Sequence, residues 1–129
     1  ELLFAICDSL GCCRFQTVFN SPHAPQYEEY RELIRLSAGL SLSLEELHEI
    51  AERIYTTERL LLAAFGVGRR QDDALPERGV SEPGPGCIDA DKYQEFLDEY
   101  YPHHGWDEDG HPTPLSLDKL GIIKANLKL

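Results

Sequence analysis

The sequence predicts an all-α fold of about five short helices with a long Gly/Pro-rich loop. Three observations predict it. Apolar residues recur at steps of three and four in several segments, no segment shows the alternation of a convincing β-strand, and Gly and Pro stand at the ends of the helical segments. The length of 129 residues, with 42% hydrophobic and 27% charged residues, is typical of one globular domain. We therefore expect residues 1–129 to form a single α-helical fragment.

The chain begins with an apolar stretch, Glu1 to Asp8, that resembles the end of a hydrophobic helix. It lacks the basic residues that open a signal peptide, and no stretch approaches the roughly 20 apolar residues that cross a bilayer. The sequence also contains no Met. We therefore expect a processed or excised piece of a longer polypeptide, and no membrane as its partner.

Two helices are expected in the first half of the chain. The segment from Gln26 to Ala38 has helical apolar spacing, and Gly39 supplies the left-handed residue that ends such a helix. Ser43 and Glu46 form the pattern of a capping box, which opens the longest helix, ending at Gly66. The expected apolar stripe of this long helix consists of Leu47, Ile50, Ala51, Ile54, Leu61 and Phe65.

The second half contains a loop and two helices. Residues 66–90 are rich in Gly, Pro and charge and show no period, so we expect a loop that is functional or lies across a partner surface. A helical pattern returns at Asp91, and Pro102 is expected to stop it. Thr113, followed by Pro114 at the first helical position, predicts a last short helix that ends at Gly121.

Negative charge is concentrated in one segment. The net charge is -11, and residues 71–109 contribute 2 basic and 12 acidic side chains, or -10 of it. Nucleic acid is therefore not an expected partner, because phosphate binding needs clustered Lys and Arg. Acidic and basic residues also alternate at the start of this segment, which predicts local ion pairs. The residues concerned are Asp72, Asp73 and Glu77 with Arg69, Arg70 and Arg78.

The four cysteines do not form the pattern of a disulfide framework. They stand at positions 7, 12, 13 and 87, and the adjacent Cys12 and Cys13 cannot easily pair with each other. The chain is also long enough to build a core without disulfides. A reducing compartment, the cytoplasm, is the expected location.

A polar segment from His103 to His111 contains three His and two Asp residues, which are zinc-ligand types. No pair has the spacing that would fix a zinc geometry. The run from Asp107 to Gly110 resembles the start of a calcium loop, but Asp118 stands where the closing Glu of the twelve-residue loop should be. A polar turn is therefore the expected structure.

The segment from Asp8 to Cys13 allows two interpretations. A carboxylate, a Gly and a thiol in a turn between two helices would place a thiolate and an acceptor on one exposed rim. Alternatively, Asp8 is a cap, Gly11 a turn residue, and Cys12 and Cys13 small buried hydrophobic residues. The sequence contains no Ser-His-Asp, P-loop or dinucleotide-binding pattern.

A series of short motifs runs along essentially the whole chain, and their order is more specific than any one of them. The motifs are Asp8 to Cys13, Ala51 to Ile54, Arg59, Gly66, Asp72 to Arg78, Glu99 to Tyr101, Gly105 to Asp107, Gly110 to Pro112, and Leu120-Gly121. In this order they resemble the C-terminal part of the tungsten-containing aldehyde:ferredoxin oxidoreductases.

The resemblance implies definite roles for two residues, Asp8 and Cys13, and gives no role for the extra thiol of Cys12. In that family an Asp-x-x-Gly-Leu-Cys motif supplies an Asp that hydrogen-bonds a pterin of the tungsten cofactor and a Cys that is the fourth ligand of a 4Fe–4S cluster. Position by position, these are Asp8 and Cys13. Gly11 would let the backbone approach the cofactor, and Cys12 replaces the Leu. Asp8, Gly11 and Cys12 are thus the expected cofactor-binding residues and Cys13 the metal ligand; no catalytic residue or general base is assigned.

The resemblance also implies a reaction for the whole enzyme. A tungsten or molybdenum bis-pterin would oxidise an aldehyde to a carboxylic acid, and the cluster would pass electrons to ferredoxin. The other three cluster cysteines of the family lie upstream of this segment. We therefore expect upstream domains of the same polypeptide as partners, a possible homo-oligomer, and no cofactor on the isolated chain. Two alternatives stay open: a diverged relative acting on another substrate, such as an aromatic thioester, or a cofactor-free helical interaction module.

Overall fold

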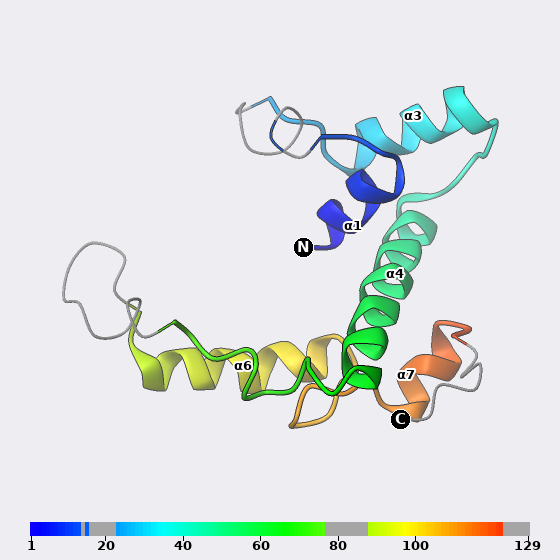
Figure 1. Cartoon of the computed structure of the whole chain (residues 1–129). Coiled ribbons are helices and arrows are strands. Elements are labelled where there is room, and N and C mark those ends of the chain that lie inside the picture. The colour runs from blue at the N-terminus through cyan, green and yellow to red at the C-terminus, as the bar shows by residue number, and fades with distance from the viewer. Residues whose placement is uncertain (14, 16–22, 77–87, 123–129) are drawn as a thin grey trace. The chain divides into compact units, whose positions relative to one another are not determined.

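The computed structural model describes residues 1–13, 15, 23–76 and 88–122. They form five helices, α1 (Leu2–Ser9), α3 (Tyr27–Ala38), α4 (Leu44–Ala64), α6 (Ala90–His103) and α7 (Pro114–Lys119) (Figure 1). The β-structure of these residues is limited to an isolated bridge between Trp106 and Pro112. The predicted all-α fold is confirmed.

The chain divides into two compact units. The first unit comprises Glu1–Tyr55 and the second comprises Thr56–Leu129, so that α4 contributes residues to both. The extent of the expected single fragment, 1–129, stays a prediction. Among the described residues, no helix combines the length and the apolarity that a membrane span requires.

In the first unit, side-chain hydrogen bonds cap the N-termini of α3 and α4. At the start of α4, the amide of Ser43 donates to Glu46 Oε2 at 2.7 Å, and the amide of Glu46 donates to Ser43 Oγ at 3.1 Å. This confirms the predicted capping box. At the start of α3, the amide of Gln26 donates to Glu29 Oε2 at 2.9 Å. Carboxylates at both positions also favour the positive end of the helix dipole.

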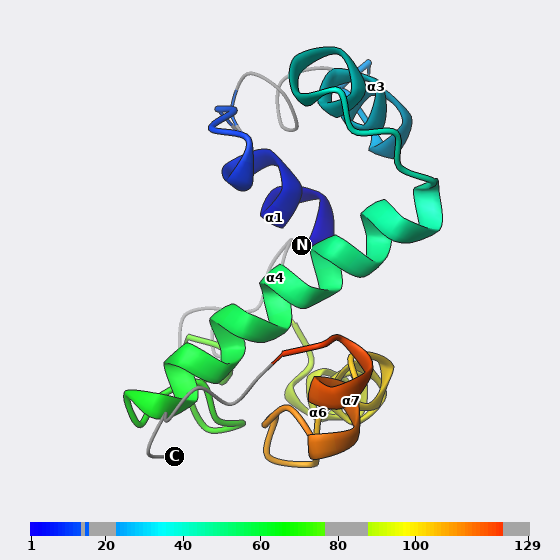
Figure 2. The same ribbon diagram turned by 90° about the vertical axis from the view of Figure 1, so that its right-hand side faces the viewer.

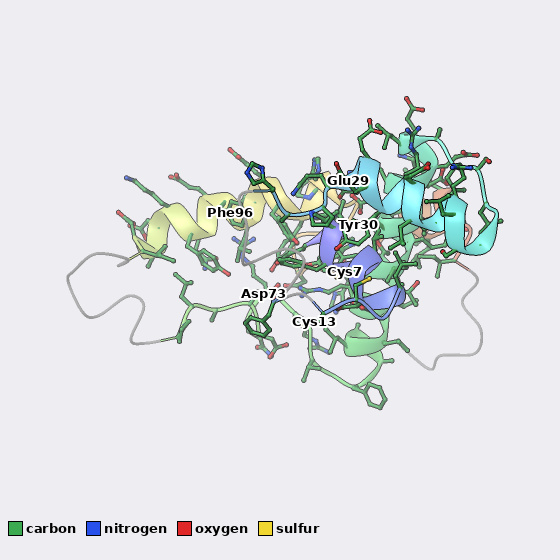
Figure 3. The ribbon with its side chains drawn as sticks, turned by 90° about the horizontal axis from the view of Figure 1, so that it is seen from above. Cys7, Cys13, Glu29, Tyr30, Asp73 and Phe96 are labelled. Atoms are coloured by element: carbon green, nitrogen blue, oxygen red, sulfur yellow. The ribbon has the colours of Figure 1, made fainter. Side chains whose placement is uncertain are left out.

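The core of the first unit lies where α1, α3 and α4 contribute apolar side chains. Helices α1 and α3 pack against each other, and Figure 3 shows Cys7 and Tyr30 on these two neighbouring helices. Burial of this surface away from water is the main stabilising contribution here. The buried members of the core are Ile6, Cys7, Tyr30, Ile34, Leu47 and Ala51.

Four helices end in the same way. After α1, α4, α6 and α7 a left-handed Gly is followed by a residue whose amide donates to the carbonyl five residues earlier, the Schellman motif. These bonds are 2.9–3.0 Å long and run from Cys12 to Cys7, Val67 to Leu62, Trp106 to Tyr101, and Ile122 to Leu117. The Gly residues that mark these helix ends in the sequence therefore share one role, the left-handed position of a Schellman motif.

Pro102 does not stop α6, contrary to the expectation. It lies inside the last turn of the helix, which continues to His103. A proline near the helix end removes only one backbone donor, while the Schellman motif at Gly105 supplies the actual stop, with the amide of Trp106 donating to Tyr101.

The apolar stripe expected for α4 is correct in the first unit and wrong in the second. Leu47 and Ala51 are buried, but Leu61 is 44% exposed and Phe65 is 83% exposed. In their place Thr56, Arg59 and Leu60 are buried. The second part of α4 thus turns a different face toward the residues of its own unit, because a polar network rather than a leucine stripe fills that interior.

The second unit contains α6, α7 and the segment from Gly66 to Pro76, which is irregular. This segment runs alongside α6, where Arg70 bonds Asp98 and Tyr93 bonds Asp73 (Figure 1). Figures 1 and 2 together place α7 near the C-terminal end of α6, where the amide of Thr113 donates to the carbonyl of Gly105 at 3.2 Å. Residues 77–87 of the expected loop lie outside the described residues, and α6 begins at Ala90.

Candidate functional site

The segment from Asp8 to Cys13, called here the Asp8–Cys13 turn, carries the predicted cofactor-binding residues. Asp8 is exposed and belongs to the last turn of α1, so it is not the cap that one interpretation expected. Gly11 has φ of 70°, a left-handed conformation that confirms its turn role. Cys13 follows the turn and is exposed, and Figure 3 shows it beyond the end of α1. The interpretation of Cys13 as a buried hydrophobic residue is wrong.

Two backbone hydrogen bonds close the turn. The amide of Gly11 donates to the carbonyl of Asp8, and the amide of Cys12 donates to the carbonyl of Cys7, both at 3.0 Å. The Cys7 thiol donates in turn to the carbonyl of Cys12 at 3.3 Å. These two backbone hydrogen bonds and the bond from the Cys7 thiol fix the conformation of the turn.

The three described cysteines differ in their suitability as metal ligands. A thiolate binds iron, so a ligand must be reachable and able to lose its proton. Cys7 is buried and donates its thiol hydrogen within the turn. Burial, and after it the neighbouring Cys7, raise the pKa of Cys12. Cys13 is the exposed thiol of the three, and it fits the role of a cluster ligand.

The turn carries two side chains of types that iron–sulfur and pterin sites use, a thiol and a carboxylate. Within the described ranges there is no group of three or more His, Cys, Asp and Glu side chains placed to hold a metal ion. An exposed thiol and an exposed carboxylate at the two ends of one turn match a fourth ligand and a hydrogen-bond acceptor. The described residues thus offer one thiol and one carboxylate on the surface of the turn.

The second unit contains a different constellation, centred on Arg59. Its guanidinium binds the Asp73 carboxylate through two bonds, Nη1 to Oδ1 at 2.9 Å and Nη2 to Oδ2 at 2.6 Å. Its Nε donates to the carbonyl of Gly110 at 2.8 Å, and the Tyr101 hydroxyl donates to Asp73 Oδ2 at 2.6 Å. This set, with Trp106, is called here the Arg59 network.

The Arg59 network is an internal ion pair in which both Asp73 oxygens accept hydrogen bonds. Arg59 is 8% exposed and lies over the Trp106 ring, with 5.0 Å from the guanidinium carbon to the ring centroid. Burial alone would raise the pKa of Asp73, but hydrogen bonds from Arg59 and Tyr101 and the charge of Arg59 outweigh it and lower that pKa. Burial and the Asp73 carboxylate raise the pKa of Tyr101 to about 12. Such a buried, bidentate pair contributes to the stability of its unit.

The predicted local ion pairs are wrong for the described residues. Asp73 pairs with Arg59 and not with its neighbours, and Arg70 pairs with Asp98 at 2.6 Å. Asp72 instead accepts the backbone amide of Arg69 at 2.9 Å. Glu77 and Arg78 lie outside the described residues. The charge pattern alone could not identify these partners. Arg59 and Asp73 do, however, both belong to the series of motifs that resembles the family.

The segment from His103 to His111 forms a polar turn, as expected. Asp107 Oδ1 accepts the amides of Asp109 at 3.0 Å and of His111 at 2.9 Å. These bonds fix the Asp107 side chain within the turn. His104 is buried between aromatic rings, 4.6 Å from the Tyr100 ring and 5.1 Å from the Trp106 ring by centroids.

Known proteins resemble nearly the whole chain. The tungsten-containing aldehyde ferredoxin oxidoreductase of Pyrococcus furiosus is 35% identical over 125 residues, which are 95% of this chain and 20% of that protein. The aliphatic sulfonate oxidoreductase, WOR-like subunit, of the same organism is 31% identical over 136 residues, covering 97% of this chain and 21% of that protein. The chain thus spans about a fifth of the length of the curated relatives it matches.

A solved structure shares the fold. It is the active-site complex BamBC of benzoyl coenzyme A reductase with 1,5-dienoyl-CoA, at a TM-score of 0.80 and 31% identity, covering 95% of this chain and 18% of that one. The family model for aldehyde ferredoxin oxidoreductase, domains 2 and 3, matches residues 1–122. The match includes the Asp8–Cys13 turn, the Arg59 network and α7. The chain belongs to the aldehyde ferredoxin oxidoreductase family.

Proposed function

We propose that this chain is the part of a tungstopterin oxidoreductase that supplies one pterin contact and one iron–sulfur ligand. The enzyme would oxidise aldehydes to carboxylic acids and pass the electrons to ferredoxin. The observation that carries the proposal is the Asp8–Cys13 turn, which exposes a carboxylate at one end and a thiol at the other. Relatives at 31–35% identity are named as tungsten-containing aldehyde ferredoxin oxidoreductases, which supports the metal and the reaction class.

Three residues of the turn have a chemical role in this proposal. The Asp8 carboxylate accepts hydrogen bonds from the amino and ring N–H groups of a pterin. Cys13 binds one iron of a 4Fe–4S cluster as a thiolate. Gly11 leaves room for the cofactor, since among the described residues nothing lies within 4 Å of where its Cβ would be. The bound metal supplies the oxygen-transfer chemistry, and the cluster carries single electrons.

The remaining ligands and partners are part of the same proposal. The chain spans about a fifth of its relatives, so the other three cluster thiolates come from other parts of one polypeptide. Tungsten is the metal favoured by the relatives' names, and molybdenum is the alternative. Ferredoxin is the proposed electron acceptor, a homo-oligomer the proposed assembly, and the cytoplasm the proposed compartment.

Replacing Cys13 tests the ligand assignment. In the holoenzyme, Cys13→Ser should reduce iron content and abolish or alter the EPR signal of the reduced cluster, because a hydroxyl is a poor iron ligand. Cys87→Ser is the matched control and should leave both unchanged. Equal effects of the two substitutions would refute the role of Cys13.

Replacing Asp8 tests the pterin contact separately. Asp8→Asn keeps the size of the side chain but removes the charge that favours N–H donors. We expect a lower pterin and tungsten content at nearly normal iron content, measured by elemental analysis and by fluorescence of the released pterin. Retention of the full metal and pterin content would remove Asp8 from the proposal.

A second candidate function is the reduction or oxidation of another substrate by the same cofactors. Two similarities favour it: the benzoyl-CoA reductase complex, whose structure contains a dienoyl-CoA, and the aliphatic sulfonate oxidoreductase subunit. Parallel assays with aldehydes, an aromatic CoA thioester and an aliphatic sulfonate distinguish these substrates. A protein that contains neither iron nor pterin would instead be a helical interaction module.

A further inference from the structure

Cys7 and Cys12 are joined by two hydrogen bonds, each of which ends on the carbonyl of the other residue. The amide of Cys12 donates to the carbonyl of Cys7 at 3.0 Å, and the thiol of Cys7 donates to the carbonyl of Cys12 at 3.3 Å. In a Schellman motif the residues at these two positions commonly make an apolar contact as well. The pair therefore closes the helix end through its backbone and its side chains.

The same pair fastens the turn to the core of the first unit. Cys7 is 0% exposed and belongs to the buried cluster with Tyr30, Ile34 and Leu47. Cys12 is partly buried and packs against that cluster. Cys13, by contrast, is exposed.

Each member of the pair is the immediate neighbour of a proposed ligand. Asp8 follows Cys7 along α1, and successive helical side chains are rotated by roughly 100°. Burying Cys7 therefore turns Asp8 toward the exposed side. Cys13 follows Cys12, whose amide and carbonyl are both bonded within the turn, so the backbone that carries Cys13 has a defined direction.

We propose that Cys7 and Cys12 are positioning residues, which hold the Asp8 carboxylate and the Cys13 thiol in place for the cofactors without binding them. This inference rests on the proposed function. The thiol of Cys7 acts as a buried hydrogen-bond donor, and the side chain of Cys12 acts as an apolar contact. A leucine at position 12, the residue expected from the family motif, would make the same apolar contact.

The test uses the holoenzyme and measures iron content, the EPR spectrum of the reduced cluster and its midpoint potential. Cys7→Ala removes the thiol donor, and we expect retained iron with a shifted EPR spectrum and potential. Cys7→Ser restores a donor of similar size and should return both toward the wild type. Cys12→Leu should match the wild type.

Ile34→Val is the matched control, because it removes one methylene from the same core and leaves the turn intact. It should lower thermal stability without shifting the potential, whereas a merely structural role of Cys7 would make the two variants alike. Cys12→Gly removes the partly buried side of the contact and keeps the test valid if Cys7→Ala fails to fold. It too should shift the potential.

The outcomes separate the two proposals. Full retention of the cluster in Cys13→Ser contradicts the proposed function itself. Loss of the cluster in Cys13→Ser, together with an unchanged potential in both Cys7→Ala and Cys12→Gly, overturns the positioning role alone. Loss of iron in Cys7→Ser equal to that in Cys13→Ser also overturns it, because Cys7 would then be a ligand.

Discussion

The turn that ends α1 and the turn that ends α6 have the same backbone in different surroundings. Gly11 and Gly105 have φ of 70° and 69°, and each is followed by a Schellman hydrogen bond. Around Gly11 the described residues leave space for a Cβ, whereas a Cβ on Gly105 would lie 2.7 Å from Ser116 Cβ. One turn is open to a partner, and the other is filled by its own unit.

Asp8 in the first unit and Asp73 in the second differ in their exposure and in their hydrogen bonds. Asp8 lies on the exposed side of the open turn, while Asp73 is bonded by Arg59 and Tyr101. A carboxylate whose acceptor sites are filled from within its unit stabilises the fold. The Asp8 carboxylate lies on the surface of its unit, where our proposal places a cofactor contact. The comparison explains why function is proposed at Asp8 and stability at Asp73.

The largest expected effect follows from breaking the Arg59 network. Asp73→Ala leaves Arg59 buried without its bidentate partner, which should cost about 3 kcal/mol of unfolding free energy, at the lower end for buried pairs because the Asp73 side chain is 27% exposed. Chemical denaturation measures it. Asp72→Ala is the control and should cost less than about 1 kcal/mol. Similar costs for both would contradict the special role of Asp73.

The next largest effect is expected from a substitution in the turn at Gly105. Gly105→Ala combines left-handed strain with a clash against Ser116, and the sum should be about 2 to 3 kcal/mol. The melting temperature and the denaturation midpoint report it. If this substitution were neutral, α6 and α7 would not pack as closely as the structure indicates.

The open turn should tolerate the same change better. Gly11→Ala adds only the left-handed strain of about 1 kcal/mol, since no described atom obstructs the Cβ. Measured beside Gly105→Ala, it isolates strain from packing. In the holoenzyme the added methyl group should nevertheless lower pterin content, because it faces the proposed cofactor. A larger stability loss at Gly11 than at Gly105 would reverse the comparison.

The smallest effect is a loss of stability at high pH. The pKa of Tyr101 is raised to about 12 in the folded protein, above its usual 10. The stability contribution is therefore complete below pH 10 and is lost as pH rises from 10 through 12. After solvent screening we expect less than about 1 kcal/mol at pH 11. Denaturation at pH 9 and pH 11 measures it, and Tyr101→Phe should show a smaller loss, because Tyr27 and Cys12 also have raised pKa values.

Local features of the chain were predictable from the sequence. The capping box of Ser43 and Glu46, the end of α3 at Gly39 and the turn at Gly11 depend on residues only a few positions apart. The candidate ligands Asp8 and Cys13 required the ordered motifs as well, because one Asp and one Cys have no diagnostic spacing. Periodicity failed in the second part of α4, where it assigned Leu61 and Phe65 to the core.

The sequence by itself determined the helical class, most of the helix ends and the family, because spacing, caps and glycines act over short distances. Only the tertiary structure decided which charges pair, as with Arg59 and Asp73, and which thiol is buried, as with Cys7, while Cys13 is exposed. These properties depend on groups far apart in the chain or on how a turn lies against a core. Their energies arise from burial and contact, which no local pattern records.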